Sequence, residues 1–156
     1  MGSRVVIVGV GNPLARDEGL GPQAIERLAR RDLPQAVEVI DAGTDLLAVI
    51  GDLEGAERVI LIDAVQAGAE PGTIHRFTLE ALLEKAADES EWRSAHDLTV
   101  VGAVRLAEAA GIRLPPTVVF GVEPGEVALG EGLTPAVEAA LDGLIETVLA
   151  EIGAAG

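Results

Sequence analysis

A continuous run of branched apolar residues near the start of the chain constrains the fold more than any other feature. It spans residues 4–10 (RVVIVGV) and has no alternating polar positions. Such a run is typical of a strand buried on both faces, which occurs in parallel sheets covered by helices on both sides. We therefore expect an interior strand, in the middle of an α/β sheet.

The rest of the chain alternates between strand-like and helix-like segments. Short apolar runs predict further strands at residues 37–41, 58–63, 73–77 and 116–122. Helical spacing predicts helices at 21–31, 45–53, 79–87, 98–110 and 135–152, with Asp45 and Asp97 as N-caps and 88–94 as a mobile loop. This order predicts a three-layer αβα sandwich around a doubly wound, mostly parallel five-stranded sheet. Residues 73–77 alternate between apolar and polar, which is typical of an edge strand, and the sequence leaves its direction open.

Composition limits the classes of partner. The chain has 156 residues, 49% of them hydrophobic, and we expect a single domain over 1–156. Acidic residues outnumber basic ones by 26 to 11, and the formal charge of −15 opposes binding to nucleic acid or to a membrane surface. The apolar start is too short for a spanning helix or a signal peptide, so we expect a cytoplasmic protein. Cysteine is absent, which leaves carboxylates and two histidines, His75 and His96, as metal-binding side chains.

Several acidic residues follow predicted strands, where ligands bind in open α/β sheets. These residues are Asp17 and Glu18 in the 9–21 loop, Asp41 after the second strand and Asp63 after the third. His96 lies in a loop that could fold over them. A dinucleotide site is one interpretation, since Gly9-Val10-Gly11 follows a strand. The third glycine of that fingerprint is replaced by Leu14, and the nearby carboxylates would repel a pyrophosphate.

A metal site is the second interpretation. Glu18, Asp63 and His96 would offer two carboxylates and an imidazole, a donor set suited to nickel or zinc with coordination positions left open. Each residue also has an ordinary explanation. Glu18 could stabilise a helix start, Asp63 could organise a turn, and His96 could be a solvated loop residue. The pattern alone leaves both explanations open.

The motifs themselves resemble those of a known family, the hydrogenase maturation proteases. The resemblance begins with GVGNPLARDEGLG at residues 9–21. It continues in order through DAGT at 41–44, IDA at 62–64, PGT at 71–73, SAH at 94–96, GVEP at 121–124 and GLTP at 132–135. It therefore spans nearly the whole chain, although residues 80–93 carry no motif that aligns.

This resemblance implies an endopeptidase that removes the C-terminal tail of a nickel-loaded [NiFe] hydrogenase large-subunit precursor, its transient partner. It implies that Glu18, Asp63 and His96 are the metal ligands and that Asp41 is a catalytic residue lining the substrate cleft. The metal would be nickel supplied by the precursor, and zinc or cadmium could occupy the same site. A non-catalytic metal-sensing or chaperone-like module that binds the precursor is the alternative. His75 is expected at the surface, without a role.

Overall fold

The computed structural model describes the backbone of residues 4–87 and 95–154 and the side chains of residues 4–85 and 100–153. The strands are β1 (Val5–Val10), β2 (Val37–Gly43), β3 (Arg58–Ala64), β4 (Ile74–Thr78) and β5 (Thr117–Val122). The α-helices are α1 (Leu20–Ala29), α2 (Leu46–Ile50), α3 (Leu79–Ala87), α4 (Ala95–Ala109) and α5 (Pro135–Ala154). Two 3₁₀ turns, η1 (Arg16–Gly19) and η2 (Gly51–Leu53), precede α1 and follow α2.

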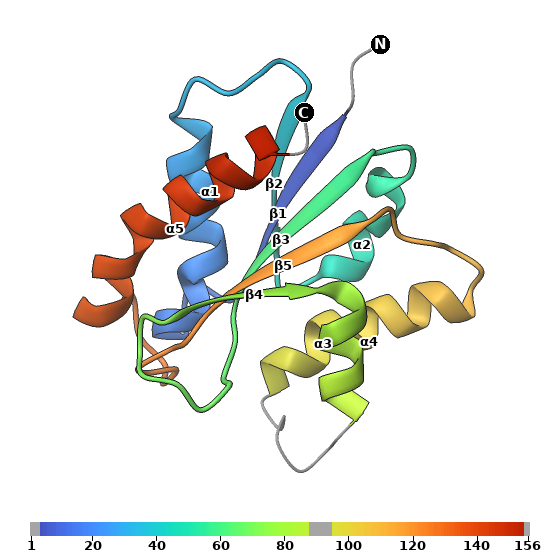
Figure 1. Ribbon diagram of the computed structural model, residues 1–156. Helices are drawn as coiled ribbons and strands as arrows, with labels where there is room; N and C mark the ends of the chain where they lie inside the picture. Colours follow the sequence, from blue (N-terminus) through green and yellow to red (C-terminus); the bar gives the residue numbers. More distant parts are fainter. Residues whose placement is uncertain (1–3, 88–94, 155–156) are drawn as a thin grey trace.

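The five strands form one sheet in the order β2-β1-β3-β5-β4. All neighbouring pairs are parallel except β4 with β5, which is antiparallel (Figure 1). The predicted α/β class and the edge position of the fourth strand are therefore confirmed, and the direction of that strand is now known. β1 is an interior strand as predicted, while the centre of the sheet is β3.

Helices cover both faces of the sheet. In Figure 1, α1 and α5 lie on one side and α2, α3 and α4 on the other. The pleat of β1 explains this arrangement, because successive side chains point to opposite faces. Val6 and Val8 pack in the core beneath α2 and α4, and Ile7 packs in the core beneath α1 and α5. The unbroken apolar sequence of β1 therefore reflects its contribution of side chains to both cores.

Glycines allow α1 to lie directly against the sheet. A Cβ atom on Gly21 would lie 2.3 Å from the Val10 carbonyl oxygen and 2.7 Å from that of Ile62. A Cβ atom on Gly9 would lie 2.4 Å from the Gly21 carbonyl oxygen. No side chain fits at those distances, so these two glycines set how closely the helix approaches β1 and β3.

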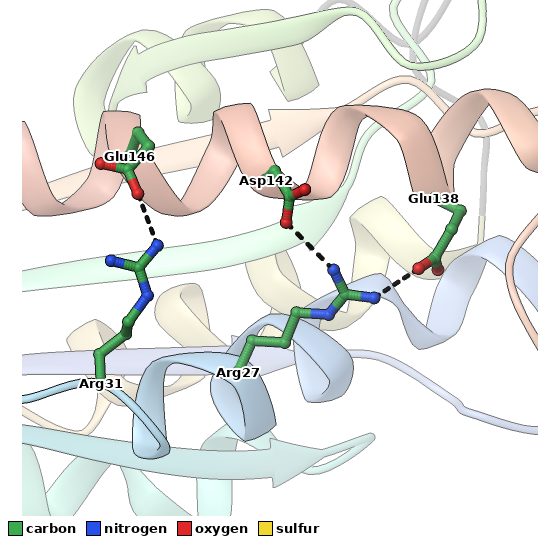
Figure 2. A network of polar contacts seen from close by, with 5 residues as sticks. All are labelled: Arg27, Arg31, Glu138, Asp142 and Glu146. Atoms are coloured by element: carbon green, nitrogen blue, oxygen red, sulfur yellow. Dashed lines mark hydrogen bonds and ion pairs between the residues drawn. The ribbon is translucent and has the colours of Figure 1, made fainter.

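Ion pairs join α1 to α5 along their exposed sides. Arg27 of α1 contacts Glu138 and Asp142, and Arg31, just beyond the end of α1, contacts Glu146 (Figure 2). Exposed pairs of this kind stabilise a protein by at most about 1 kcal/mol each. The buried apolar face between the two helices and the sheet therefore contributes more to their packing than the charges do.

Three local predictions were wrong at their boundaries. The segment before α1 is the 3₁₀ turn η1 instead of an irregular loop. The predicted 45–53 helix divides into α2 and η2, although Asp45 is the N-cap as predicted and accepts from the Ala48 amide at 3.1 Å. α4 begins at Ala95, so Asp97 belongs to its first turn instead of capping it. Acidic residues are favourable in the first turn of a helix because their negative charge interacts with the positive end of the helix dipole.

The predicted 88–94 loop lies outside the described residues. Within the described part of the chain, no helix combines the length and the apolar character that a membrane span requires.

Candidate metal and substrate site at the carboxyl edge of the sheet

Two of the predicted ligands lie on elements that contact each other at one corner of the sheet. Glu18 belongs to η1, which contacts β3, and Asp63 is the penultimate residue of β3. Gly21, in the first turn of α1 just after η1, lies close to the carbonyl of Ile62, the residue that precedes Asp63. Glu18 is half-buried, and Asp63 is only 2% exposed. One carboxylate oxygen of Asp63 accepts from the Ala64 amide at 2.8 Å.

The third predicted ligand lies on the helix that covers the same face. Alternation along β3 places Asp63 on the face of Leu61, and Leu61 packs with Val100 and Val101 of α4. His96 lies in the first turn of α4, and its side chain lies outside the described residues. Among the side chains that the structure does describe, no three His, Asp or Glu residues gather closely enough to hold a metal. The arrangement of the complete triad therefore stays a prediction.

Asp41 lies apart from this corner. It is exposed at the end of β2, and its Oδ1 accepts from the Gly43 amide at 2.8 Å. It pairs with Gly9 of β1, which in turn pairs with Ile62 of β3. Two interstrand spacings, about 10 Å, therefore separate Asp41 from β3. The structure does not bring Asp41 beside Asp63, but both lie along the carboxyl edge of the sheet.

A second acidic residue of the first loop, Asp17, is completely buried. Its Oδ2 accepts from the amides of Gly125 and Glu126 at 2.7 and 2.9 Å and from the Thr134 hydroxyl at 2.7 Å. Its Oδ1 accepts from the Thr134 amide at 2.7 Å. Burial by itself raises the pKa of Asp17, but these hydrogen bonds outweigh burial and hold its pKa below the ordinary value. The sequence marked Asp17 only as a loop carboxylate, so its structural role was missed.

The backbone of the first loop is joined to the same distant segment. Ala15 and Gly130 form a parallel bridge, with hydrogen bonds from the Gly130 amide to the Leu14 carbonyl at 2.8 Å and from the Arg16 amide to the Gly130 carbonyl at 3.0 Å. The Asp17 amide also donates to the Glu126 carbonyl at 2.9 Å. Residues 14–17 and 125–134 therefore form one wall beside Glu18, which we call the η1 wall.

His75 lies on the edge strand β4, as the sequence suggested, but it is only partly exposed. Its side chain is 20% exposed, its Nε2 lies 3.2 Å from Oε1 of Glu123, and its ring stacks on Phe77. Glu123 is buried and also accepts from the amides of Ala67 and Ala69 at 3.0 to 3.1 Å. The GVEP motif thus supplies a carboxylate that holds the loop between β3 and β4, just beyond Asp63.

Known proteins resemble this chain over nearly its full length. Residues 22–151 match the sequence profile of the family described as hydrogenase maturation protease. The hydrogenase 2 maturation protease of Escherichia coli strain K12 is 32% identical over 155 residues, which cover 98% of this chain and 93% of that protein. A putative hydrogenase maturation protease of Methanocaldococcus jannaschii is 32% identical over 156 residues, covering 95% and 96% of the two chains.

Solved structures agree with these sequence matches. The hydrogenase maturating endopeptidase HybD from Escherichia coli has a TM-score of 0.84 at 31% identity, covering 98% of this chain and 94% of that chain. The [NiFe] hydrogenase maturation protease HybD from Thermococcus kodakarensis has a TM-score of 0.78 at 29% identity, with 93% and 96% covered. On the sequence profile, the long alignments and the shared fold, the chain belongs to the hydrogenase maturation protease family.

Proposed function

We propose that this protein is an endopeptidase that removes the C-terminal tail of a [NiFe] hydrogenase large-subunit precursor, and that nickel carried by the precursor is its recognition element. The observation that carries the proposal is the contact of η1, which contains Glu18, with β3, which contains Asp63 near its end, in a chain of this family. A metal-sensing or chaperone-like module without peptidase activity would use the same corner, so turnover is what an experiment has to test.

The donor set of the corner suits the metal. Glu18 and Asp63 supply carboxylate oxygens, and His96, in the first turn of α4, would supply an imidazole nitrogen. Mixed oxygen and nitrogen ligands of this kind bind nickel and zinc, and cadmium is a further divalent ion that we expect the site to accept. Because three protein ligands leave coordination positions open, the precursor can retain its own ligands to the nickel.

In the proposed reaction, the metal and the side chains of Asp63 and Asp41 have different roles. Nickel held there would polarise the scissile carbonyl or the attacking water. Asp63 is buried at the end of a central strand, so its carboxylate is held in place before the precursor arrives. Asp41 is exposed further along the same edge, and we assign it the task of orienting the tail by accepting hydrogen bonds from its backbone.

The test uses purified protein with nickel-loaded or nickel-free precursor and follows the mass of the precursor. We expect a short C-terminal peptide to be lost only from the nickel-loaded form. Asp63→Ala and Glu18→Gln should each lower the cleavage rate roughly 100-fold or more, because a metal contributes several kcal/mol to the transition state. Asp32→Ala is the matched control, since Asp32 is exposed in the loop between α1 and β2, at the opposite edge of the sheet.

The two outcomes separate the two functions. Full cleavage by folded Asp63→Ala would overturn the assignment of Asp63 as a metal ligand. Tight binding of nickel-loaded precursor by the wild-type protein without any mass change would favour the non-catalytic module instead.

A further inference from the structure

The carboxylate of Asp17 ties the first loop to a segment more than a hundred residues away. Both of its oxygens accept hydrogen bonds from residues 125–134, and the side chain is fully buried. Its immediate neighbour, Glu18, is half-buried and belongs to the same 3₁₀ turn. The backbone of η1 carries both residues, so whatever fixes Asp17 also fixes the starting point of the Glu18 side chain.

Thr134 is the central partner in this attachment. Its hydroxyl and its amide both donate to Asp17, each at 2.7 Å. Thr134 directly precedes α5, and its carbonyl accepts from the Glu138 amide in the first turn of that helix at 2.9 Å. The Asp17 carboxylate is therefore attached to the start of α5, the longest helix in the described part of the chain, and through that helix to a buried core.

The backbone beside Asp17 adopts a conformation that needs such support. Arg16 has a φ of +50°, the only positive value at a non-glycine residue in the described part of the chain. Residues in that region persist when the surrounding structure determines them from several sides. Here the amide of Arg16 donates to the Gly130 carbonyl and its Nε donates to the Gly132 carbonyl at 2.9 Å. The η1 wall thus holds the turn that presents Glu18.

We infer that Asp17 and Thr134 are positioning residues for Glu18: their buried hydrogen bonds fix η1 so that the Glu18 carboxylate is preorganised for the metal. The inference rests on the proposed function, in which Glu18 is a metal ligand. Outer hydrogen bonds that orient a ligand typically change metal affinity 10- to 100-fold, although they never touch the metal. Asp17 itself is turned toward residues 125–134, so it acts through Glu18.

The test compares two substitutions of one residue. Thr134→Val removes the hydroxyl donor and keeps the size of the side chain, whereas Thr134→Ser keeps the hydroxyl. Each variant carries all 156 residues, and the probe is Ni²⁺ alone, titrated by calorimetry. The second readout is the ¹⁵N relaxation dispersion of the Glu18 and Gly19 amides without metal. Val148→Ala is the control for general loss of stability, because Val148 is a fully buried residue of α5 in the opposite half of the helix.

We expect Thr134→Val to bind Ni²⁺ roughly tenfold more weakly and to show conformational exchange at Glu18, while Thr134→Ser and Val148→Ala stay near the wild-type values. Unchanged relaxation at Glu18 in folded Thr134→Val would overturn the inference. Equal Ni²⁺ affinity of Thr134→Val and the wild type would overturn it as well. Failure of the wild-type protein to bind any Ni²⁺ would count against the metal part of the proposed function, and the relaxation data would then decide the inference alone.

Discussion

The buried carboxylates of Asp17 and Glu123 are stabilised by backbone amides from two loops that border the proposed site. Asp17 accepts from the amides of Gly125, Glu126 and Thr134, and Glu123 accepts from those of Ala67 and Ala69. A buried carboxylate is costly unless hydrogen bonds replace its hydration. Each of these two carboxylates therefore fixes the shape of the loop whose amides it accepts from, and those hydrogen bonds offset the cost of burying it.

Glu123→Ala should loosen the loop between β3 and β4. The substitution leaves the amides of Ala67 and Ala69 without their acceptor, and we expect it to lower the free energy of unfolding by about 2 kcal/mol. Amide hydrogen exchange at those two residues should become faster by roughly tenfold or more. Glu70→Ala, an exposed glutamate of the same loop, is the control and should leave that exchange unchanged. Unaltered protection of both amides in Glu123→Ala would contradict this role.

At the scale of elements, the ion pairs of α5 differ in how well they are shielded from water. The pair of Glu146 with Arg31 is exposed, with side-chain exposures of 65% and 47%. Near the C-terminal end of the helix, Glu151 is 16% exposed and accepts from Nε and Nη2 of Arg76 at 2.9 and 3.0 Å, while Arg58 donates to its backbone carbonyl. Arg76 itself is 51% exposed, so the second arrangement differs from the first in the burial of its carboxylate and in its two-point geometry, both of which strengthen an ion pair.

Glu151→Gln should therefore cost about 1 kcal/mol of unfolding free energy at neutral pH. The hydrogen bonds from Arg76, and the charges of Arg76 and Arg58, hold the pKa of Glu151 below its ordinary value of 4.5 against the opposing effect of burial. A carboxylate whose folded pKa is lowered stabilises the protein above its unfolded pKa, and this stability disappears as the pH falls through the folded value.

Urea unfolding of wild type and Glu151→Gln from neutral pH down to about pH 3 checks this, since the difference between them should shrink below about pH 4.5. Glu146→Gln is the control, and we expect it to stay within about 0.5 kcal/mol of the wild type throughout. A Glu151→Gln deficit that persists undiminished in acid would show that the loss comes from packing and not from the charge.

The elements were predictable to the extent that local pattern determines them. The buried strand β1 was identified from its unbroken apolar run, and β4 was placed at an edge from its alternation. The start of α4 was placed three residues too late because Asp97 is as favourable inside a first turn as at a cap. The turn η1 was missed because its conformation depends on hydrogen bonds to residues 126–132, which no local pattern reveals.

At the scale of the whole molecule, the site shows the same limit. Glu18, Asp63 and Asp41 were located at the carboxyl edge because strand ends can be recognised from sequence. The wall that supports Glu18 was not foreseen, since the contact between Asp17 and Thr134 joins residues 117 positions apart. The contact of His75 with Glu123 was missed for the same reason, because Glu123 follows a different strand.

The net charge of −15 predicts how the whole protein responds to salt. Excess negative charge opposes the compact state, and salt screens that repulsion over a Debye length of about 8 to 10 Å at physiological ionic strength. Raising NaCl from roughly 20 to 500 mM should therefore shift the midpoint of urea unfolding at pH 7 upward. The shift should vanish near pH 4.3, the isoelectric point. A fall in stability with salt at pH 7 would mean that the surface ion pairs outweigh the repulsion.

The attachment of the first loop to residues 125–134 also orders the events of folding. A chain emerging from the ribosome would carry Glu18 and Asp63 long before it carried Thr134, because the two halves of the η1 wall are encoded at opposite ends of the sequence. Closing so long a loop is entropically unfavourable until the strands between its ends have paired. We therefore expect the corner that contains Glu18 and Asp63 to be completed late, after the sheet, so that the activity proposed for it would arise only once Thr134 has been synthesised.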